Sequence, residues 1–420
     1  MHSTIHKRLQ NPSGTSEKTA ALSQDYKLQK DFYGREVASP SSENKEEIIC
    51  SDAQDHFKMA DKATYGLKHC QVPEVFRVPF IVSGYRSPGF SFWECIRSLL
   101  RSSNETINVW SHLLALVLFV SVNMTSLPTD DPFFLPLISF AVGISVLYLT
   151  SSFAHLFNCM SEKFHRICFF FDYAAIGFYT FTAGQALFFY SRTAGASARA
   201  IYDSLAVFQT VSTVFSFLAT LLCCVSSHPR WRNCKSVLRV AILAVNWLVI
   251  TSPYTVRLLL CKNADPAYNG VSMVYFKRHV IFCSLGAVLY AARVPERLMS
   301  GVFDNFGQSH NLAHVLIAMG IQQAFNTAQV DLQERRTVLQ ERFSSQPTIV
   351  NTVGMAVIVL FGHVAIVLWF ASKLWFAKLK PKDWELTGRL DFRRFLESGL
   401  RSSPRRVRGG ARAPFPNSGW

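Results

Sequence analysis

The strongest constraint on this chain is a series of apolar segments that are long enough, or nearly so, to cross a membrane as helices. A crossing takes about 20 mostly apolar residues. We expect eight such helices, of which the first, sixth and seventh are the shortest. They cover Val109–Val122, Phe133–Phe157, Ile167–Tyr190, Ile201–Val225, Val237–Leu260, His279–Ala292, Asn311–Phe325 and Ile349–Phe376.

Charge is concentrated at the two ends of the chain, which leaves the middle strongly apolar. Of 420 residues only 17% are charged, whereas 49% are hydrophobic. The pattern predicts an all-α polytopic membrane protein with a seven-helix core and an eighth, C-terminal transmembrane helix. We expect four parts. Residues 1–75 form a disordered polar tail and residues 76–330 form the seven-helix membrane core. Residues 331–376 form a loop and the eighth transmembrane helix, and residues 377–420 form a basic cytoplasmic tail.

Basic residues predict the orientation of the helices, because Lys and Arg accumulate on the cytoplasmic side. The segment Lys373–Arg412 holds 12 Lys or Arg and four Asp or Glu. With eight helices, the N- and C-termini are then both cytoplasmic. This tail directly follows a span and lacks interleaved aromatic residues, so we expect it to contact anionic lipid and not nucleic acid. The ten cysteines form no CxxC pair, so no disulfide framework is expected.

Ionisable side chains inside spans are costly and therefore mark candidate functional sites. His310 and His314 are four residues apart, which places both imidazoles on one face of a helix. Ser151 and His155 have the same spacing near the end of the second span, and Asp172 lies near the start of the third. In the predicted orientation, all three histidines and Asp172 fall at a similar depth in the inner leaflet.

Three imidazoles at one depth suit a zinc ion with an open fourth position. Asp172 would then hydrogen-bond or deprotonate a bound water, while Ser151 would hydrogen-bond an oxygen nearby. From the residues alone, ordinary helix packing by buried histidines is an equal alternative. Copper and iron also remain open, although zinc suits imidazole ligands without a redox role.

A further polar cluster stands where the first span begins. The spacing puts Glu105, Asn108 and His112 on one helix face. The interpretation that we favour is N-terminal capping, in which Ser103 or Asn104 caps the helix and Glu105 favours its dipole. The alternative is a polar clamp on neighbouring helices.

Taken in order, these motifs resemble the progestin and adipoQ receptor family. The resemblance covers about Val72 to Val330, and two further stretches are most similar to the membrane progestin receptors: Val72-Pro73-Glu74-Val75-Phe76 and Ser83-Gly84-Tyr85-Arg86. The family motifs are Asn104-Glu105-Thr106 with Asn108 and His112, Ser151-x-x-x-His155, Phe171-Asp172-Tyr173, Pro295-Glu296-Arg297 and Ser309-His310-x-x-x-His314.

The resemblance implies a seven-helix core with an inner-leaflet zinc ion. His155, His310 and His314 would be its ligands, and Asp172 and Ser151 would lie beside the metal-bound water. The wider superfamily includes alkaline ceramidases, which are similar in using zinc on a lipid amide.

Two functions follow from the resemblance. The first is a steroid receptor of the progestin type, expected in the plasma membrane, with rapid non-genomic signalling through a G protein or another effector. Polar groups that could orient a steroid are Gln185, Tyr179 and Gln209. The alternative is a zinc-dependent, ceramidase-like lipid amidohydrolase with Asp172 as its proton carrier, so the enzyme question stays open. A purely structural zinc ion is the third interpretation.

Overall fold

The structure is a computed structural model that describes residues 64–124, 131–193, 204–231, 234–260, 270–342 and 345–376. Within these ranges the chain is all-helical and contains no strand, only an isolated bridge between Leu67 and Tyr85. Most of the expected N-terminal tail and all of the expected basic tail lie outside the described residues.

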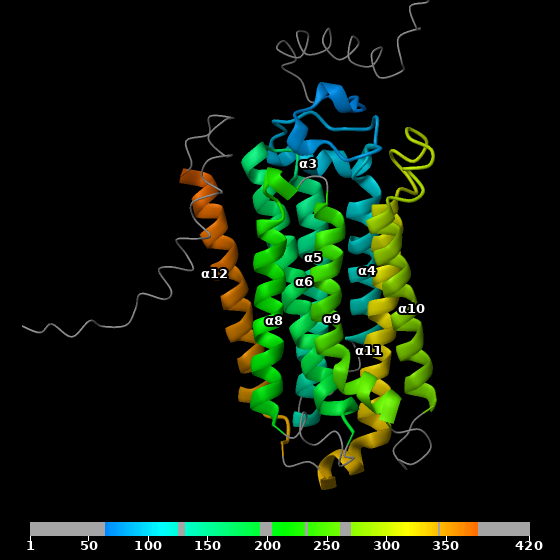
Figure 1. The fold of residues 1–420 in the computed structure, drawn as a ribbon, viewed down its shortest axis with the longest axis vertical. Coiled ribbons are helices and arrows are strands. Elements are labelled where there is room, and N and C mark those ends of the chain that lie inside the picture. Colours follow the sequence, from blue (N-terminus) through cyan, green and yellow to red (C-terminus); the bar gives the residue numbers. More distant parts are fainter. Residues whose placement is uncertain are drawn as a thin grey trace, which may run out of the picture. The chain divides into compact units, whose positions relative to one another are not determined.

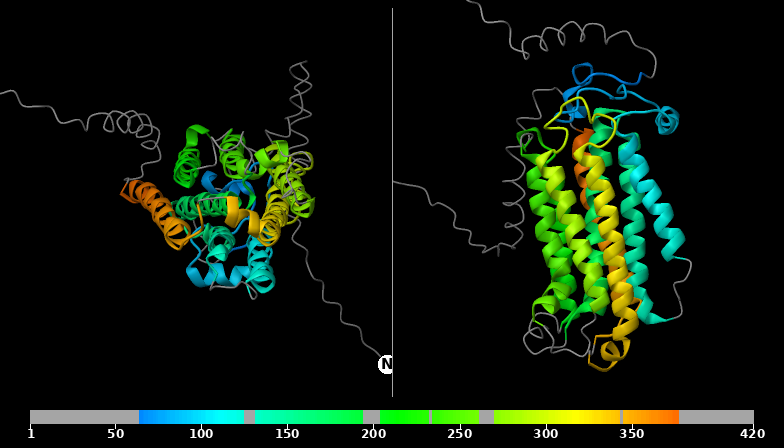
Figure 2. Two further views of the ribbon diagram at one scale, coloured as in Figure 1. Left: turned by 90° about the horizontal axis from the view of Figure 1, so that it is seen from below. Right: turned by 90° about the vertical axis from the view of Figure 1, so that its right-hand side faces the viewer.

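Eight long helices run side by side and alternate in direction (Figures 1 and 2). Among the described residues, seven are long and apolar enough to cross a membrane, and α11 is the long helix that is not among them. The eight are α4 (Thr106–Asn123), α5 (Leu135–Phe157), α6 (Glu162–Ser191), α8 (Leu205–Val225), α9 (Lys235–Leu260), α10 (Gly270–Ala292), α11 (Ser309–Arg342) and α12 (Met355–Phe376).

Short helical turns lie before and between the long helices. They are η2 (His69–Gln71), η3 (Glu74–Phe76), α3 (Phe92–Arg97), η4 (Ser98–Leu100), η5 (Pro132–Phe134), η6 (Pro229–Trp231) and the π-helical turn η7 (Val350–Gly354). The end of the bundle where α4, α6, α9 and α11 begin is called the near end below, and the opposite end is called the far end.

The expected spans agree with the helices except in the sixth and seventh. Helix α10 begins at Gly270, nine residues before the expected start at His279. Helix α11 continues past Phe325 to Arg342 and is therefore about 50 Å long. With the seventh span expected to end at Phe325, the predicted topology would place Arg335 in the outer loop that follows. That assignment is wrong, because Arg335 lies within α11 and is only 1% exposed.

Helix α6 is the central helix of the bundle. In its apolar window 78% of the residues are buried, compared with 22–50% in the other six candidate spans. Its aromatic side chains Phe181 and Phe188 are almost completely buried, as is Phe140 of α5. The outer helices instead expose apolar side chains, such as Leu118 of α4 at 63%. This distribution is expected when lipid surrounds the bundle, because lipid solvates apolar surface.

Helix α12 is attached to the bundle by polar side chains that the sequence had suggested as steroid contacts. The Gln185 side-chain amide donates to the Asn351 carbonyl at 3.1 Å, and that of Gln209 donates to the same carbonyl at 2.6 Å. This carbonyl lies in η7, the π-helical turn that precedes α12. Both glutamines therefore bind backbone of this chain. The third suggested contact, Tyr179, packs its ring against Phe140.

A buried histidine fixes α12 farther along its length. His363 Nδ1 lies 3.0 Å from the Thr220 hydroxyl of α8. The ring fits beside Gly177 of α6, where an added Cβ would approach the His363 ring to 2.5 Å. Only a glycine at this position allows the three helices to approach so closely.

Part of the expected N-terminal tail is folded. Leu67, Val72 and Phe76 form a small apolar cluster with Ile81 and Tyr85 at the near end. Leu67 and Val72, which fall in the expected tail, thus pack against residues of the expected core. Residues 64–75 contain too few apolar side chains for the sequence to predict a folded segment. These side chains nevertheless pack against residues that follow them in the chain.

Candidate functional site

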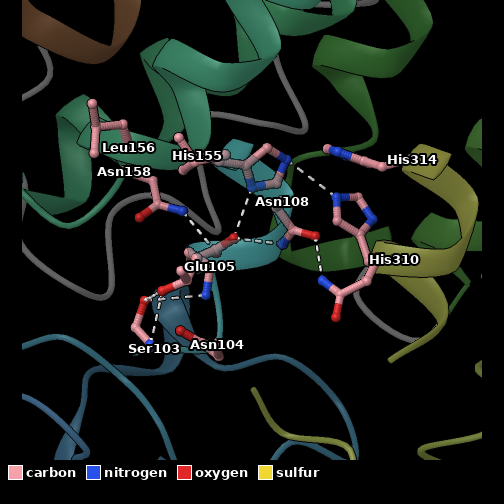
Figure 3. A network of polar contacts seen from close by, with 12 residues as sticks. Ser103, Asn104, Glu105, Asn108, His155, Leu156, Asn158, His310 and His314 are labelled. Carbon is pink, nitrogen blue, oxygen red and sulfur yellow. Dashed lines mark hydrogen bonds and ion pairs between the residues drawn. The ribbon is translucent and has the colours of Figure 1, made fainter. Parts of the chain in front are cut away.

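Three of the sequence-predicted site residues meet at the near end. His155 comes from the last turn of α5, whereas His310 and His314 come from the first two turns of α11. One nitrogen from each ring lies within 4.8 Å of the others. Figure 3 shows the three rings facing one another. His310 and His314 share one face of α11, and His155, which was predicted with them, meets them from α5.

Hydrogen bonds determine which ring nitrogens face the cluster. His155 Nδ1 lies 2.7 Å from a carboxylate oxygen of Glu105, so it carries the proton and donates it. The Ser111 hydroxyl donates to the Asn108 carbonyl at 3.0 Å and can accept from His314 Nδ1, 3.1 Å away. In both histidines the Nε2 lone pair is therefore directed away from these partners. This is the tautomer that a metal ligand requires.

The distances fit a metal ion held by imidazole nitrogens. His155 Nε2 and His310 Nε2 are 3.2 Å apart. Two nitrogens bound to one tetrahedral zinc ion, each at about 2.0–2.1 Å, are separated by about 3.3 Å. Two facing lone pairs repel each other unless a proton or a cation lies between them. The histidine cluster, His155, His310 and His314, can therefore hold a metal ion and would leave a fourth position open.

Glu105 stands at the N-terminus of α4, as the capping interpretation expects, and is also the acidic partner of the histidine cluster. Its side chain caps no helix N-terminus. One carboxylate oxygen accepts from His155 and from the Asn108 amide at 2.7 Å each, and the other accepts from Asn158 at 2.8 Å (Figure 3). Burial raises the pKa of Glu105, but the His155 imidazole and the Asn108 amide outweigh it and hold the pKa well below its usual range. The carboxylate thus links the start of α4 to the end of α5.

His112 completes the predicted polar cluster but does not point a nitrogen into the group of three. Its ring stacks on that of His314, with centroids 4.0 Å apart and planes 9° apart. Neither of its ring nitrogens has a hydrogen-bond partner among the described residues. The contact restricts the rotation of His314. Asn108 accepts from Asn311 of α11 at 2.7 Å and thereby links α4 to α11.

Asp172 and Ser151 lie beside the cluster. The Ser151 hydroxyl hydrogen-bonds the Asp172 carboxylate, which also interacts electrostatically with His155. Asp172 is 9% exposed, and its Oδ1 has no hydrogen-bond partner among the described residues. The carboxylate is not among the groups that converge on a common metal position. Its free oxygen can accept a hydrogen bond from a polar group that enters the site.

The sequence analysis missed Arg86 as a residue of the site. Its guanidinium is 5% exposed and donates to the carbonyls of His155 and Leu156 at 2.7 Å each. It also donates to Asn158 at 2.9 Å and to Ser98 at 2.9 Å. These carbonyls are among those left without partners at the end of α5. Arg86 had been counted only as a basic residue of an inner loop, and the one further signal was its place in the family motif.

Glu296 has a similar function at the start of α11. Its carboxylate is 1% exposed and accepts from the Ser309 backbone N–H at 2.7 Å and from the Ser309 hydroxyl. Negative charge at a helix N-terminus is favourable because of the helix dipole. The residue that follows, His310, belongs to the histidine cluster. Glu296 therefore fixes the turn that carries this histidine.

The segment before α3 is joined to the loop before α11. Asp304 accepts from the backbone N–H groups of Val82 and Ser83 at 3.0 and 2.7 Å. Next to them, Gly84 has a φ of 84°, and an added Cβ would lie 2.0 Å from Asn305 Oδ1. Glycine is required at this position for both reasons. The motif Ser83-Gly84-Tyr85-Arg86 thus closes the near end over the histidine cluster.

A second buried polar cluster at the far end was not predicted. Arg257 of α9 donates to Asp331 of α11 at 2.7 Å, and the side chains are 1% and 0% exposed. The Ser191 hydroxyl donates to the same carboxylate oxygen at 2.7 Å. Arg335 donates to the carbonyls of Tyr190 and Arg192. We call Arg257, Asp331 and Ser191 the far-end ion pair. It connects α6, α9 and α11.

Comparisons with known proteins agree with this architecture. The haemolysin-III related family matches residues 100–324, which include every residue of the histidine cluster. Membrane progestin receptor gamma-B of Danio rerio is 33% identical over 339 residues, covering 74% of this chain and 94% of the relative. Human membrane progestin receptor gamma is 30% identical over 313 residues, covering 73% and 92%.

A third relative, membrane progestin receptor delta of Mus musculus, is 31% identical over 313 residues, covering 72% of this chain and 89% of the relative. All three are named as receptors, so they do not favour the amidohydrolase alternative. They agree with the stretches that had indicated the membrane progestin receptors within the family. The chain is a multi-pass membrane protein that belongs to the haemolysin-III related, progestin and adipoQ receptor family.

Proposed function

We propose that this protein is a membrane receptor for a steroid of the progestin type that signals to a cytoplasmic effector, such as a G protein, from the plasma membrane. The observation that carries the proposal is the similarity to relatives named membrane progestin receptors, which extends over 94% of the length of one of them. A steroid is a rigid apolar molecule with few polar groups, and it can enter from lipid between helices.

We further propose that α11 crosses the membrane as the eighth spanning helix, with the near end in the cytoplasmic leaflet. Helix α11 packs along α10 over most of the bundle (Figures 1 and 2). Some of its polar side chains are buried against other helices, as Asp331 at 0% and Thr327 at 0% exposure illustrate. A helix that buries its polar side chains against protein tolerates a low mean hydropathy. This topology places the N-terminal tail and the basic C-terminal tail in the cytoplasm.

Zinc is the metal that we propose for the histidine cluster, with His155, His310 and His314 as its ligands. A bound zinc ion supplies a positive charge that polarises an oxygen in the open fourth position. Glu105 holds His155 in the required tautomer, and the Ser111 hydroxyl does the same for His314. Asp172 and Ser151 provide hydrogen-bonding groups beside that position for the polar end of a ligand.

Two measurements on the same purified protein test these proposals separately. The first is saturable binding of tritiated progesterone to the full chain in nanodiscs, with a non-steroid lipid as competitor. Specific binding displaced by progestins supports the receptor, and its absence from folded protein contradicts it. The second is metal content by mass spectrometry, where about one zinc per chain is expected in the wild type.

Variants make the metal test specific to the cluster. His310→Ala is expected to lose the zinc. The matched control is His279→Ala, which removes a buried histidine of α10 whose two nitrogens already bind Trp247 and the Gly320 carbonyl at 2.9 Å. The control should keep its zinc. Equal zinc in both variants would contradict the assignment of the ligands.

A further inference from the structure

The segment between the folded N-terminal region and α4 is apolar on its outer side. In α3 and η4, Phe92, Trp93 and Leu100 are 46%, 68% and 87% exposed. On the inner side of the same turns, Cys95 and Ser98 are 0% and 4% exposed. Large apolar side chains concentrated on one face of a short segment indicate a contact surface, because isolated exposure of this extent in water is unfavourable.

The apolar surface of α3 continues onto the outer surface of α5. The Trp93 and Phe92 rings are 5.3 Å apart, and Phe92 stacks on Phe157 at 5.0 Å. Phe157 in turn lies 4.4 Å from Phe153, which is 47% exposed on α5. Since α5 is a candidate membrane span, Phe153 belongs to its lipid-facing surface. The four rings thus form a chain of contacts from the exposed Phe153, through the buried Phe157, to Phe92 and Trp93.

Positive charges lie beside these rings. Arg97, at the end of α3, is exposed, and so is Arg101, which follows η4. Aromatic residues with flanking arginines are typical of segments located at the boundary between acyl chains and headgroups. In the topology proposed above this boundary belongs to the cytoplasmic leaflet, which is rich in anionic lipid.

We propose that Phe92–Leu100 is a lipid-binding segment that lies in the plane of the membrane. Phe92, Trp93 and Leu100 insert between the acyl chains, while Arg97 and Arg101 contact anionic headgroups. The occupant of this surface is the lipid leaflet itself. The segment does not require bound metal or steroid, so it can be tested independently of both.

Hydrogen bonds connect this segment to the histidine cluster. The Ser98 hydroxyl accepts from Arg86 at 2.9 Å, and the other terminal nitrogen of Arg86 donates to the His155 carbonyl at 2.7 Å. The Trp110 indole of α4 donates to the Leu99 carbonyl at 3.0 Å. The lipid leaflet therefore contacts a segment that is two hydrogen bonds away from the backbone of a candidate metal ligand. Through these hydrogen bonds, the position of His155 depends on the position of α3 relative to the lipid leaflet.

The depth of the segment can be measured with a spin label. Trp93→Cys is labelled in full-length protein in which Cys50, Cys234 and Cys261 are replaced by Ser, and the protein is placed in nanodiscs. The collision rate of the label with each of two relaxation agents is measured. Frequent collision with oxygen, which dissolves in lipid, indicates that the label is in the bilayer. Frequent collision with a water-soluble nickel complex indicates that the label is in water. Leu118→Cys on the exposed surface of α4 is the lipid reference, and Glu74→Cys on η3 is the aqueous reference.

The expected result is that the label at Trp93 meets oxygen at least several times more often, relative to nickel, than the label at Glu74 does. An accessibility ratio equal to that of Glu74 would overturn the proposal, because the segment would then lie in water. The folded state of each labelled protein is checked by thermal unfolding.

The role of the arginines has its own test. In wild-type protein, adding phosphatidylserine to phosphatidylcholine nanodiscs is expected to raise Tm. Arg97→Gln/Arg101→Gln should lose at least half of that rise. Arg230→Gln/Arg297→Gln, which removes two other exposed arginines at the near end, should keep it. If both double variants lost the same share of the rise in Tm, the effect would come from the total positive charge at the near end. That result would contradict a specific headgroup contact at α3.

Discussion

The histidine cluster and the far-end ion pair are both buried in one helix bundle, and both use α11, yet they differ in how their polar groups are satisfied. At the far end, the charge of Asp331 is balanced by Arg257 at 2.7 Å. At the near end, two ring nitrogens face each other at 3.2 Å beside the half-buried carboxylate of Glu105. At the far end two opposite charges balance each other, whereas the near end has the composition of a site for a cation.

This difference suggests separate roles for the two regions: the far-end ion pair contributes to stability, and the histidine cluster contributes to function. A buried ion pair connects helices, and each of its charges is balanced by the other. A group of neutral imidazoles with its protons directed outward is poorly arranged for packing and well arranged for binding. We therefore expect changes at the far end to alter stability, and changes at the near end to alter metal binding.

The largest effect is expected from Asp331→Asn. The substitution keeps the shape of the side chain but removes the carboxylate that balances Arg257 in the bundle interior. Breaking a buried pair in this way costs about 3–5 kcal/mol. Thermal unfolding of the purified protein in nanodiscs, together with its yield, measures the loss.

A double variant tests whether the pair acts as a unit. Arg257→Met/Asp331→Leu replaces both charges with apolar side chains of similar size. Its cost should be smaller than that of Asp331→Asn, because no charge of the pair is left behind. Zinc content should not change in either variant. If the folded double variant lost its zinc, the far end would also affect metal binding, and the assigned difference between the two regions would be contradicted.

The next largest effect is expected on removal of metal from the near end. If the folded state alone binds zinc, with free zinc at several hundred times its Kd, chelation lowers stability by about 3–4 kcal/mol. The chelator should therefore lower the Tm of the wild type but leave that of His310→Ala unchanged. A wild type whose Tm stays constant after its zinc has been removed would indicate that the cluster contributes nothing to the fold.

The sequence predicted the helices well because hydropathy is a local property, and it failed where burial depends on neighbours. Helix α11 was expected to end at Phe325, since Asn326 and Asp331 read as polar and outside a span. In the structure Asp331 is buried by contacts with α6 and α9. A hydropathy window contains no information about which helix will cover a polar side chain.

In the candidate site, too, the sequence predicted features that depend on local spacing and missed contacts between distant residues. The i,i+4 spacing of His310 and His314 indicated one face of one helix, and the topology added His155. Glu105 was interpreted as favouring the helix dipole beside a Ser103 or Asn104 cap, because acidic residues are favourable at helix N-termini in any sequence. Its contact with His155 spans 50 residues, and no local pattern reports it. The family resemblance, and not the local chemistry, was the signal that favoured the correct group.

A smaller effect is expected from Glu105→Gln, which retains a hydrogen-bonding side chain and removes its charge. Loss of a carboxylate behind a metal-ligating histidine typically weakens metal binding by about 10–100-fold. Competition with a zinc-binding dye measures the affinity, and thermal unfolding measures the fold. Asn158→Ala is the matched control, since it removes another partner of the same carboxylate at 2.8 Å. An equal effect of both variants on affinity would assign Glu105 a structural role only.

The smallest effect is expected from Glu296→Gln, which tests whether α11 transmits a change to the cluster. The amide oxygen can still accept from the Ser309 N–H, so mainly the charge at the helix N-terminus is lost, at a cost of about 1 kcal/mol. Because His310 follows Ser309 directly, zinc affinity should fall several-fold while the far end is unaffected. If Tm falls and zinc affinity does not, the first turn of α11 is held by the metal ligands themselves. Glu296 would then contribute to stability alone, as the far-end ion pair does.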